Sequence, residues 1–316
     1  MANYLVTGGA GFIGSHMAEE LVRRGHRVRV ADSLVTGSKT NIAHLPTVDF
    51  VLGDLADADV ARRAVDGMDY VLHQAALPSV PKSVEDPASS HRANVDAALN
   101  VLIAARDARV KRVVFAGSSS AYGNLPELPK TEAMPTAPLS PYALQKLVVE
   151  QYCRMFTDLY GLETVTTRYF NVFGPRQDPS SPYSGVISIF ITMMTSGKMP
   201  TIYGDGGQTR DFTYVANVVD GVLRAAEAPK ASGHVINVAT GGRISLNELA
   251  ETVRRLTGAK GTITYAPERA GDVRDSQADI SKARELLGYS PTIPFDEGLA
   301  RTIKWYTESQ ATRAAS

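Results

Sequence analysis

Residues 3–16 read NYLVTGGAGFIGSH, a short apolar run that leads into a glycine-rich turn and then into a helical pattern. Gly9, Gly11 and Gly14 have G-x-G-x-x-G spacing, and Gly8, Gly11 and Gly14 have G-x-x-G-x-x-G spacing. Glycine permits a tight turn, and it lets the backbone N–H groups at the positive end of a helix approach a pyrophosphate closely. The stretch therefore predicts a strand, a phosphate-binding turn and a helix, in that order.

The next apolar run, RVRVAD at residues 27–32, ends in Asp32. A carboxylate at this distance from the glycines can accept hydrogen bonds from an adenosine ribose, and it would repel a 2′-phosphate. Asp54, after the third apolar run, could reach the adenine, although an ordinary helix cap explains that residue nearly as well. No Gly-Lys-Ser/Thr sequence follows the glycines, which excludes a P-loop. These residues favour a bound NAD, rather than NADP or a glycine turn without a ligand.

Apolar runs alternate with helical patterns through the first half of the chain. The runs include RVRVAD, VDFVLGD, MDYVLHQAA and VKRVVFAGSSS, and a helical stretch, NVDAALNVLIAARDA, precedes the last of them. Strands and helices in alternation require parallel pairing with crossover helices, and strands that are apolar at successive positions suit a sheet covered on both faces. The predicted fold class is α/β, with a doubly wound parallel Rossmann sheet.

The composition changes after about residue 170, where loops rich in proline, glycine and serine separate shorter helices. Such a composition suits a smaller mixed α/β C-terminal substrate domain that shapes a pocket over the sheet. The run HVINVAT at residues 234–240 predicts one more buried strand, which returns to the first domain. We therefore expect an NAD-binding domain over residues 1–170 with a returning segment near 211–240, and a substrate-binding domain made of residues 171–210 and 241–316.

The charges of the 316 residues balance, with 33 lysines and arginines against 33 aspartates and glutamates. No global field favours a nucleic acid or an anionic membrane surface, so neither is expected as a partner. Cys153 is the only cysteine, which excludes an internal disulfide and suits a reducing compartment. Without a basic leader, or an apolar run near the roughly 18 residues of a membrane span, the chain is predicted to be cytoplasmic. His16, His73 and His91 lie on separate predicted elements, so no metal site is expected.

The stretch SPYALQK, residues 140–146, places Tyr142 and Lys146 on one face of a predicted helix. The ordinary pKa of tyrosine is near 10, but a neighbouring ammonium and a positively charged nicotinamide would favour the phenolate. Such a pair can transfer protons near neutral pH. In isolation the pattern is more often a packing tyrosine beside a solvated lysine. Here FAGSSSAYG adds hydroxyl groups just past the fifth strand, at the edge where open α/β sheets bind ligands, which favours chemistry; these groups belong to Ser118, Ser119 and Ser120.

Together TGGAGFIG, Asp32, SSSAYG, SPYALQK and RYFNVFGPRQ resemble the extended branch of the short-chain dehydrogenase/reductase superfamily, most closely the NDP-sugar 4-epimerases. The resemblance extends from about residue 3 to about residue 290. It implies a tightly held NAD and a UDP-linked sugar between the two domains. Tyr142 would take the proton of the sugar 4′-hydroxyl, Ser118 would steady that hydroxyl, and Lys146 would hold the nicotinamide ribose. The 4-keto sugar would then turn over and receive hydride on its other face.

The same resemblance implies two sets of binding residues. Those expected at the cofactor are Gly8, Gly11, Phe12, Ile13, Gly14, Asp32, Ser33, Gly37, Asp54, Leu55, Ala75, Ala76, Asn94, Tyr142, Lys146, Tyr169 and Phe170. Those expected at the substrate are Ser79, Ser118, Ser119, Ser120, Tyr142, Asn171, Gly185, Val186, Tyr203, Arg210, Arg274 and Ser276.

Arg210 and Arg274 are the diphosphate contacts that the resemblance implies, because a guanidinium pairs with phosphate oxygens bidentately. The alternative is that they form surface ion pairs with Asp211 and Asp272. Ser276 lies where the resemblance places the pocket wall near the sugar 2′-substituent. A bulky aromatic residue there would exclude an N-acetyl group, so a serine predicts that UDP-N-acetylhexosamines are accepted along with, or in preference to, plain UDP-hexoses.

The same residues distinguish between related enzyme activities. A nucleotide-sugar 4,6-dehydratase typically needs an Asp-Glu pair where this chain has Ser119 and Ser120, and UDP-glucuronate decarboxylases usually carry a glutamate in that segment. A UDP-glucuronate 4-epimerase, or another NDP-sugar-modifying enzyme, stays open. A non-catalytic NAD-sensing protein on the same fold would be marked by loss of the tyrosine or the lysine, and both are present.

The resemblance also implies a homodimer in which helices near 92–108 and 143–160 pack as a four-helix bundle. The stretch ALNVLIAA within the first helix is apolar over more than one face, which a buried core would also explain.

Overall fold

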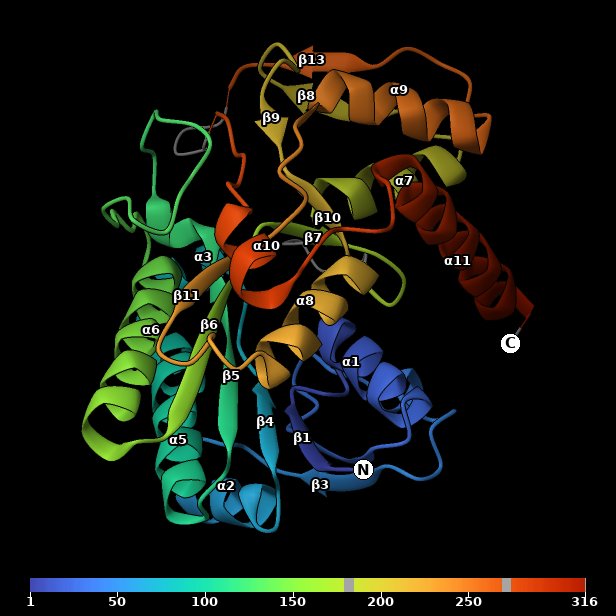
Figure 1. Ribbon diagram of the computed structural model, residues 1–316. Coiled ribbons are helices and arrows are strands. Elements are labelled where there is room, and N and C mark those ends of the chain that lie inside the picture. The colour runs from blue at the N-terminus through green and yellow to red at the C-terminus, as the bar shows by residue number, and fades with distance from the viewer. Residues whose placement is uncertain (179–184, 269–273, 316) are drawn as a thin grey trace.

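The computed structural model describes residues 1–178, 185–268 and 274–315 (Figure 1). Its centre is a seven-stranded sheet with the order β11-β6-β5-β4-β1-β2-β3, in which every neighbouring pair is parallel. The strand order reverses between β1 and β4, so the predicted α/β fold with a doubly wound parallel sheet is confirmed. The strands are β1 (Asn3–Thr7), β2 (Arg27–Asp32), β3 (Asp49–Leu52), β4 (Tyr70–His73), β5 (Arg112–Ser118), β6 (Glu163–Tyr169) and β11 (Val235–Val238).

Helices cover both faces of this sheet (Figure 1). On one face lie α1 (Phe12–Arg23) and α8 (Val215–Glu227); on the other lie α2 (Ala58–Val65), α5 (Ala97–Asp107) and α6 (Pro141–Tyr160). Each face has its own hydrophobic core, and β1 contributes Tyr4 and Val6 to the first and Leu5 to the second. Because side chains alternate across a strand, a strand that is buried on both faces must be apolar at successive positions.

The later elements form a smaller mixed α/β layer beyond the carboxyl ends of the strands, at the top of Figure 1. The run at residues 234–240 forms β11, which pairs with β6 and so returns to the main sheet as predicted. The domain boundaries themselves stay a prediction. In this layer β7 (Asn171–Phe173) pairs with β10 (Phe212–Tyr214), β8 (Thr201–Tyr203) with β13 (Thr264–Ala266), and β9 (Thr209–Arg210) with β12 (Ile244–Ser245). Its helices are α7 (Val186–Thr195), α9 (Leu246–Thr257) and α11 (Phe295–Ala315), whereas α10 (Ser281–Leu287) packs against β11 of the main sheet and against α8.

Short elements connect the strands of the sheet. They are the 3₁₀ turns η1 (Lys39–Asn41) and η3 (Ser119–Tyr122), the helices α3 (Val80–Glu85) and α4 (Pro87–His91), and the π-helical turn η2 (Arg92–Asp96). Across the described ranges no helix is long and apolar enough to cross a bilayer. Within the same residues no group of three or more His, Cys, Asp and Glu side chains is placed to hold a metal ion.

Candidate active site

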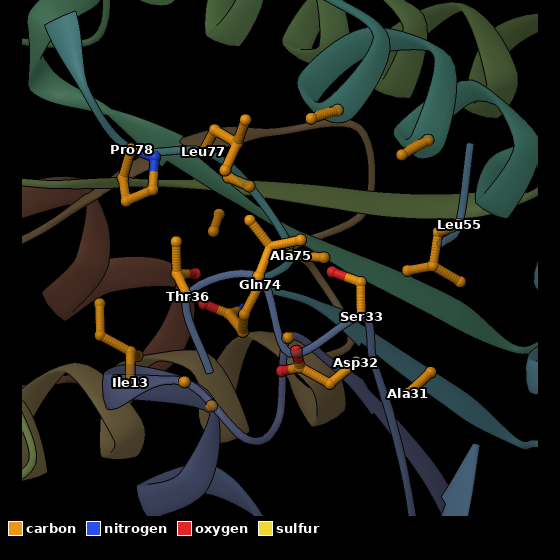
Figure 2. Close-up of a pocket in the computed structure, with 18 of the residues that line it drawn as sticks. Ile13, Ala31, Asp32, Ser33, Thr36, Leu55, Gln74, Ala75, Leu77 and Pro78 are labelled. Carbon is orange, nitrogen blue, oxygen red and sulfur yellow. The ribbon is translucent and has the colours of Figure 1, made fainter. Parts of the chain in front are cut away.

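The carboxyl ends of the central strands open into a crevice with a volume of about 450 Å³. Figure 2 shows Ile13, Asp32, Leu55, Gln74 and Leu77 around it, on segments that are far apart in the sequence. The crevice lies at the reversal of strand order, which is where open α/β sheets bind ligands. The residues expected at a cofactor that line it are Gly8, Gly11, Phe12, Ile13, Gly14, Asp32, Ser33, Asp54, Leu55, Ala75, Ala76, Tyr142, Lys146 and Tyr169.

The glycine turn forms one wall of the crevice and leaves no room for side chains at two positions. Gly8 has a φ of 63°, and a Cβ there would lie 2.8 Å from Cα of Ala75. A Cβ on Gly14 would lie 2.3 Å from the carbonyl oxygen of Gly8. Helix α1 begins directly after Gly11, which provides no side-chain cap. The first N–H groups of α1 therefore lie beside the crevice, as an approaching pyrophosphate requires.

Asp32 is held in a fixed orientation at the end of β2. Its Oδ2 accepts a hydrogen bond from the backbone N–H of Ala10 at 3.0 Å, and its Oδ1 accepts one from Leu34 at 2.8 Å. The carboxylate is only 7% exposed, and each oxygen retains a lone pair for a ribose hydroxyl. Gly37 packs against Asp32, because a Cβ there would lie 2.9 Å from the carboxylate, but Gly37 does not line the crevice.

Asp54 lies at the end of the crevice where Leu55 also contributes. Its carboxylate accepts from the backbone N–H of Ala56 at 2.9 Å and pairs with Arg92 at 2.5 Å. The N-cap of α2 is Asp57, which accepts from the N–H of Asp59, so the helix-cap alternative for Asp54 is wrong. Arg92 also lines the crevice, although no local motif marks it in the sequence.

Helix α6 brings Tyr142 and Lys146 to the opposite end of the crevice. Ser140 caps the helix by accepting from the N–H of Ala143, and Pro141 occupies its first position. The ammonium of Lys146 donates to the carbonyl oxygen of Ala116 at 2.8 Å and lies 6.0 Å from the centroid of the Tyr142 ring. The two side chains share one helical face, as the i, i+4 spacing predicts.

Burial is the main cause of the pKa shifts of Tyr142 and Lys146. Burial raises the pKa of Tyr142 to about 12, partly offset by a hydrogen bond from Ser118 to the phenol. Burial lowers the pKa of Lys146 to about 8. Lys146 does not lower the pKa of Tyr142 as predicted. Its ammonium donates to a backbone carbonyl and lies 6.0 Å from the centroid of the tyrosine ring.

Among the three serines at the end of β5, Ser118 is the one whose hydroxyl lowers the pKa of Tyr142. Its Oγ also accepts from the Oγ of Ser120 at 2.8 Å and from the backbone N–H of Ser120 at 3.2 Å. Ser120 therefore supports Ser118. Ser119 begins the 3₁₀ turn η3. This arrangement agrees with the choice of Ser118, whose catalytic role stays a prediction.

Three other residues expected at the cofactor differ in their surroundings. Tyr169 lines the crevice, and its hydroxyl donates to Oε1 of Gln74 at 2.9 Å. Phe170 is buried in the hydrophobic core and does not line the crevice. Asn94 is 3% exposed, and its amide bonds Leu77, Ser90 and Gln145 rather than facing the crevice. Direct contact of Phe170 and Asn94 with a cofactor stays a prediction.

Of the residues expected at the substrate, Tyr142 lines the crevice, whereas Ser118, Ser119, Ser120 and the others lie outside its lining. Ser79 caps α3 by accepting from the N–H of Lys82, and Asn171 in β7 donates its backbone N–H to the carbonyl of Asp211. Gly185 is the N-cap of α7, Val186 is its first residue, and Tyr203 ends β8.

Arg210, Arg274 and Ser276 come together at β9. Arg210 Nη1 donates to the carbonyl oxygen of Arg274 at 2.8 Å, and the N–H of Ser276 donates to the carbonyl of Thr209 at 3.1 Å. Arg274 forms ion pairs with Asp205 at 3.2 Å and Glu268 at 3.4 Å. Asp211 is fully buried and its carboxylate bonds other segments, so it does not form the surface ion pair that was the alternative for Arg210. Asp272, the alternative partner of Arg274, lies outside the described residues.

The sequence interpretation missed several crevice residues. They do not belong to a motif, and the only signal for most of them is their place just after a strand or in the helices that follow it. They are Ala31, Val35, Thr36, Gly53, Gln74, Leu77, Pro78, Ser89, Arg92, Ala93, Ala97, Ala116 and Gly117.

Known proteins resemble this chain over nearly its whole length. Residues 4–239 match the NAD dependent epimerase/dehydratase family. A protein of Methanocaldococcus jannaschii named "Putative UDP-glucose 4-epimerase" is 41% identical over 310 residues, which cover 98% of this chain and 99% of that protein. The solved structure of UDP-N-acetylglucosamine 4-epimerase from Methanobrevibacter ruminantium, in complex with UDP-N-acetylmuramic acid, is 40% identical, with a TM-score of 0.93 over 98% of this chain and 99% of that one. UDP-glucose 4-epimerase of Thermus thermophilus, in complex with NAD, is 37% identical, with a TM-score of 0.89 over 96% and 99%.

Proposed function

Because the chain belongs to the NAD-dependent epimerase/dehydratase family, we propose that it is an isomerase that interconverts the C4 epimers of a UDP-linked sugar with bound NAD. The observation that carries this function is the crevice itself. It has the glycine turn and Asp32 on one side and the Tyr142–Lys146 pair on the other. The glycine turn would hold the pyrophosphate of a dinucleotide bound there, and Tyr142 and Lys146 would lie at its nicotinamide end.

The crevice fits NAD by its own geometry. The positions of Gly8 and Gly14 admit no Cβ, the start of α1 is uncapped by a side chain, and Asp32 keeps lone pairs for the adenosine ribose. A 2′-phosphate would meet the Asp32 carboxylate, which favours NAD over NADP. When bound, NAD supplies a reversible acceptor for the hydride at C4 of the sugar.

Tyr142 is the proton-transfer residue in this proposal. In its phenolate form, its oxygen takes the proton from the sugar 4′-hydroxyl, becoming the phenol, and returns it to the 4-keto oxygen when C4 is reduced after the sugar has turned over. Ser118, whose hydroxyl lowers the pKa of the phenol, steadies the same sugar hydroxyl. Lys146 donates one N–H to Ala116 and has two left for the nicotinamide ribose. The nicotinamide charge near the phenol opposes the effect of burial, which holds the tyrosine pKa at about 12.

The UDP moiety is assigned to the segment around β9. The Arg210 guanidinium donates there to the backbone carbonyl of Arg274, whose own guanidinium pairs with Asp205 and Glu268. A guanidinium suits diphosphate oxygens because of its planar donor geometry. Ser276 is bonded to the same strand and is small. We therefore favour conversion of UDP-GlcNAc and UDP-GalNAc, with or without UDP-glucose and UDP-galactose. Conversion of UDP-glucuronate, or another modification of an NDP-sugar, is the nearest alternative. A non-catalytic NAD sensor is disfavoured, since Tyr142, Ser118 and Lys146 are assembled in one place.

The test uses the purified chain with no cofactor added. Denaturation should release NAD⁺, and NMR of separate UDP-GlcNAc, UDP-glucose and UDP-glucuronate samples should show the C4 epimer appearing in at least the first. A heat-denatured sample is the control for chemical isomerisation. Epimerisation of UDP-glucose with UDP-GlcNAc unchanged contradicts the hexosamine preference. Bound NAD⁺ without conversion of any UDP-sugar supports the sensor instead.

The proposal includes a homodimer in the cytoplasm. Support for the dimer comes from α6, which packs beside α5 and leaves Leu144, Met155 and Leu159 exposed (Figure 1). At offsets of 11 and 15 residues these three side chains lie on one side of the helix, a stripe that a second copy could cover. The single, buried and unpaired Cys153 suits a reducing compartment.

A further inference from the structure

Gln145 immediately precedes Lys146 in α6 and is 4% exposed, yet the chemistry described above does not use it. Its Oε1 accepts two hydrogen bonds, one from Ser90 Oγ at 2.8 Å and one from Asn94 Nδ2 at 2.8 Å. Both donors come from the α4–η2 segment, more than 50 residues away in the sequence. Gln145 therefore joins two elements that the sequence does not place together.

Asn94 continues this connection to the wall of the crevice. Its Oδ1 accepts from the N–H of Leu77 at 2.7 Å, and its Nδ2 donates to the carbonyl oxygen of Leu77 at 3.3 Å. Leu77 lines the crevice beside Gln74 and Pro78 (Figure 2). Asn94 lies in the π-helical turn η2, and such turns are frequent at functional sites. The contacts form one buried path, from the crevice wall through Asn94 to helix α6.

Two further hydrogen bonds hold the same turn of α6. The N–H of Tyr142 donates to Ser83 Oγ at 3.0 Å, and Lys146 Nζ donates to the carbonyl of Ala116 at 2.8 Å. Successive helical residues are rotated by about 100°, so the anchors at Gln145 and Lys146 point in different directions. Together they fix both the rotation and the position of the turn that carries Tyr142. An apolar side chain at position 145 would remove a buried acceptor from Ser90 and Asn94 and free this turn to shift.

We propose that Gln145 is a positioning residue for the reaction: through Asn94 it locks the Tyr142–Lys146 turn of α6 to the Leu77 wall of the crevice. This inference rests on the proposed epimerase function. Its consequence is that the distance between the phenol oxygen and the sugar 4′-hydroxyl depends on a side chain that touches neither substrate nor cofactor. Such misplacements by about 1 Å can lower a rate by roughly 100-fold.

The test compares two variants. Gln145→Met keeps the length of the side chain but removes the acceptor oxygen, whereas Gln145→Glu keeps an acceptor oxygen. Gln151→Met is the matched control, since Gln151 is exposed on the same helix and an apolar side chain there keeps the apolar character of the proposed dimer stripe. Gln145→Met should lower kcat by roughly 10- to 100-fold, with KM for the UDP-sugar changed less than about threefold and bound NAD⁺ kept near the control. The melting temperature should fall by a few degrees, because two buried donors lose their acceptor, but the protein should stay folded at the assay temperature. Gln145→Glu should recover most of the loss.

A second readout separates positioning from general stability. A misplaced phenol should slow the second reduction of the 4-keto sugar, so that more keto sugar leaves the enzyme. The cofactor then stays reduced, and its near-ultraviolet absorbance rises during turnover. Gln145→Met should show this accumulation, and Gln151→Met should not. If Gln145→Met does not fold, Ser90→Ala, which removes one of the two donors, should show the same changes at smaller size.

A kcat of Gln145→Met within about twofold of the control contradicts the positioning role, and so does a fall in kcat that follows loss of folded protein and is not recovered by Gln145→Glu. If Gln145→Met does not fold, an unchanged kcat and no reduced cofactor in Ser90→Ala contradict it as well. A wild-type protein that epimerises no UDP-sugar contradicts the proposed function, and the positioning role fails with it. An active wild type with an unaffected Gln145→Met contradicts the positioning role alone.

Discussion

Tyr142 combines a half-buried ring, a neighbouring hydroxyl group on Ser118 and a lysine one helical turn away. Replacing it by phenylalanine removes only the phenol oxygen, so binding groups elsewhere in the crevice are unchanged. We expect Tyr142→Phe to lower kcat by about 10²- to 10⁴-fold, the usual contribution of a general acid–base group. NAD⁺ released on denaturation should equal that of the wild type. Tyr160→Phe, an exposed tyrosine on the same helix, is the control, and equal loss of activity in both variants would contradict the role of Tyr142.

His73 connects protonation to stability. It ends β4 with 2% exposure, its Nδ1 lies 2.8 Å from the hydroxyl of Thr7, and burial lowers its pKa to about 3. The unfolded chain takes up a proton near pH 6.5, whereas the folded chain stays neutral at this site. The stability from neutral His73 is therefore complete above pH 6.5 and is lost as the pH falls toward 3, by roughly 1.4 kcal/mol per pH unit.

The measurement for this prediction is urea unfolding at pH 7.0 to 5.0. The free energy of unfolding should fall with pH below about 6.5, and His73→Gln should make that fall shallower. His16 has its pKa lowered to about 4 by burial, so part of the slope should persist in the variant. His91→Gln, at an exposed histidine, should keep the wild-type slope. An unchanged slope in His73→Gln would show that His73 does not account for the pH dependence.

Helix α8 ends against a buried arginine from a distant strand. Arg112, at the start of β5, is 5% exposed, and its Nη1 donates to the carbonyl oxygens of Ala225, Ala226 and Ala228 at 2.9, 3.2 and 2.7 Å. The last carbonyls of a helix have no partner within the helix, and the helix dipole favours a cation at that end. The guanidinium also pairs with Glu163 at the start of β6.

Arg112→Leu should therefore lower the free energy of unfolding by roughly 2–3 kcal/mol, because several buried carbonyls lose their donor at once. Arg106→Leu is the control, since Arg106 pairs with Asp107 at the surface and should change stability by no more than about 0.5 kcal/mol. Chemical unfolding of both variants measures the difference. Equal small effects would mean that water replaces the guanidinium at the end of α8.

The elements that the sequence predicts well are those specified by neighbouring residues. The glycine turn and the Tyr142–Lys146 face each depend on a few consecutive positions, and Asp32 depends on its place at the end of the next strand, so spacing along the sequence reveals them. Contacts made by the fold are different. Nothing beside Asn94 or Gln145 in the sequence indicates their shared hydrogen bond. A helix cap is a reasonable local interpretation of Asp54, and only the fold shows that Asp57 caps α2 while Asp54 pairs with Arg92.

The sheet and the C-terminal layer are joined by one buried carboxylate. Asp211, just before β10, accepts from the N–H and hydroxyl of Thr240, from the N–H of Gly241 and from the N–H of Ala278. These residues follow β11 of the main sheet and the segment that carries Arg274 and Ser276. The proposed diphosphate contacts are thus positioned by the same residue that fixes the end of the sheet, which explains how loops rich in glycine can form a defined site.

Assembly should depend on the exposed stripe of α6. A double variant, Met155→Glu with Leu159→Glu, places two charges where a partner helix would pack, and burying unpaired carboxylates costs several kcal/mol. Light scattering after size exclusion should give twice the 33.9 kDa chain mass for the wild type and the chain mass for the double variant. Leu52→Glu is the control, because Leu52 is 58% exposed at the end of β3, away from α6, and should leave the dimer intact. A monomeric wild type at micromolar concentration, or a double variant that stays dimeric, would rule out this interface.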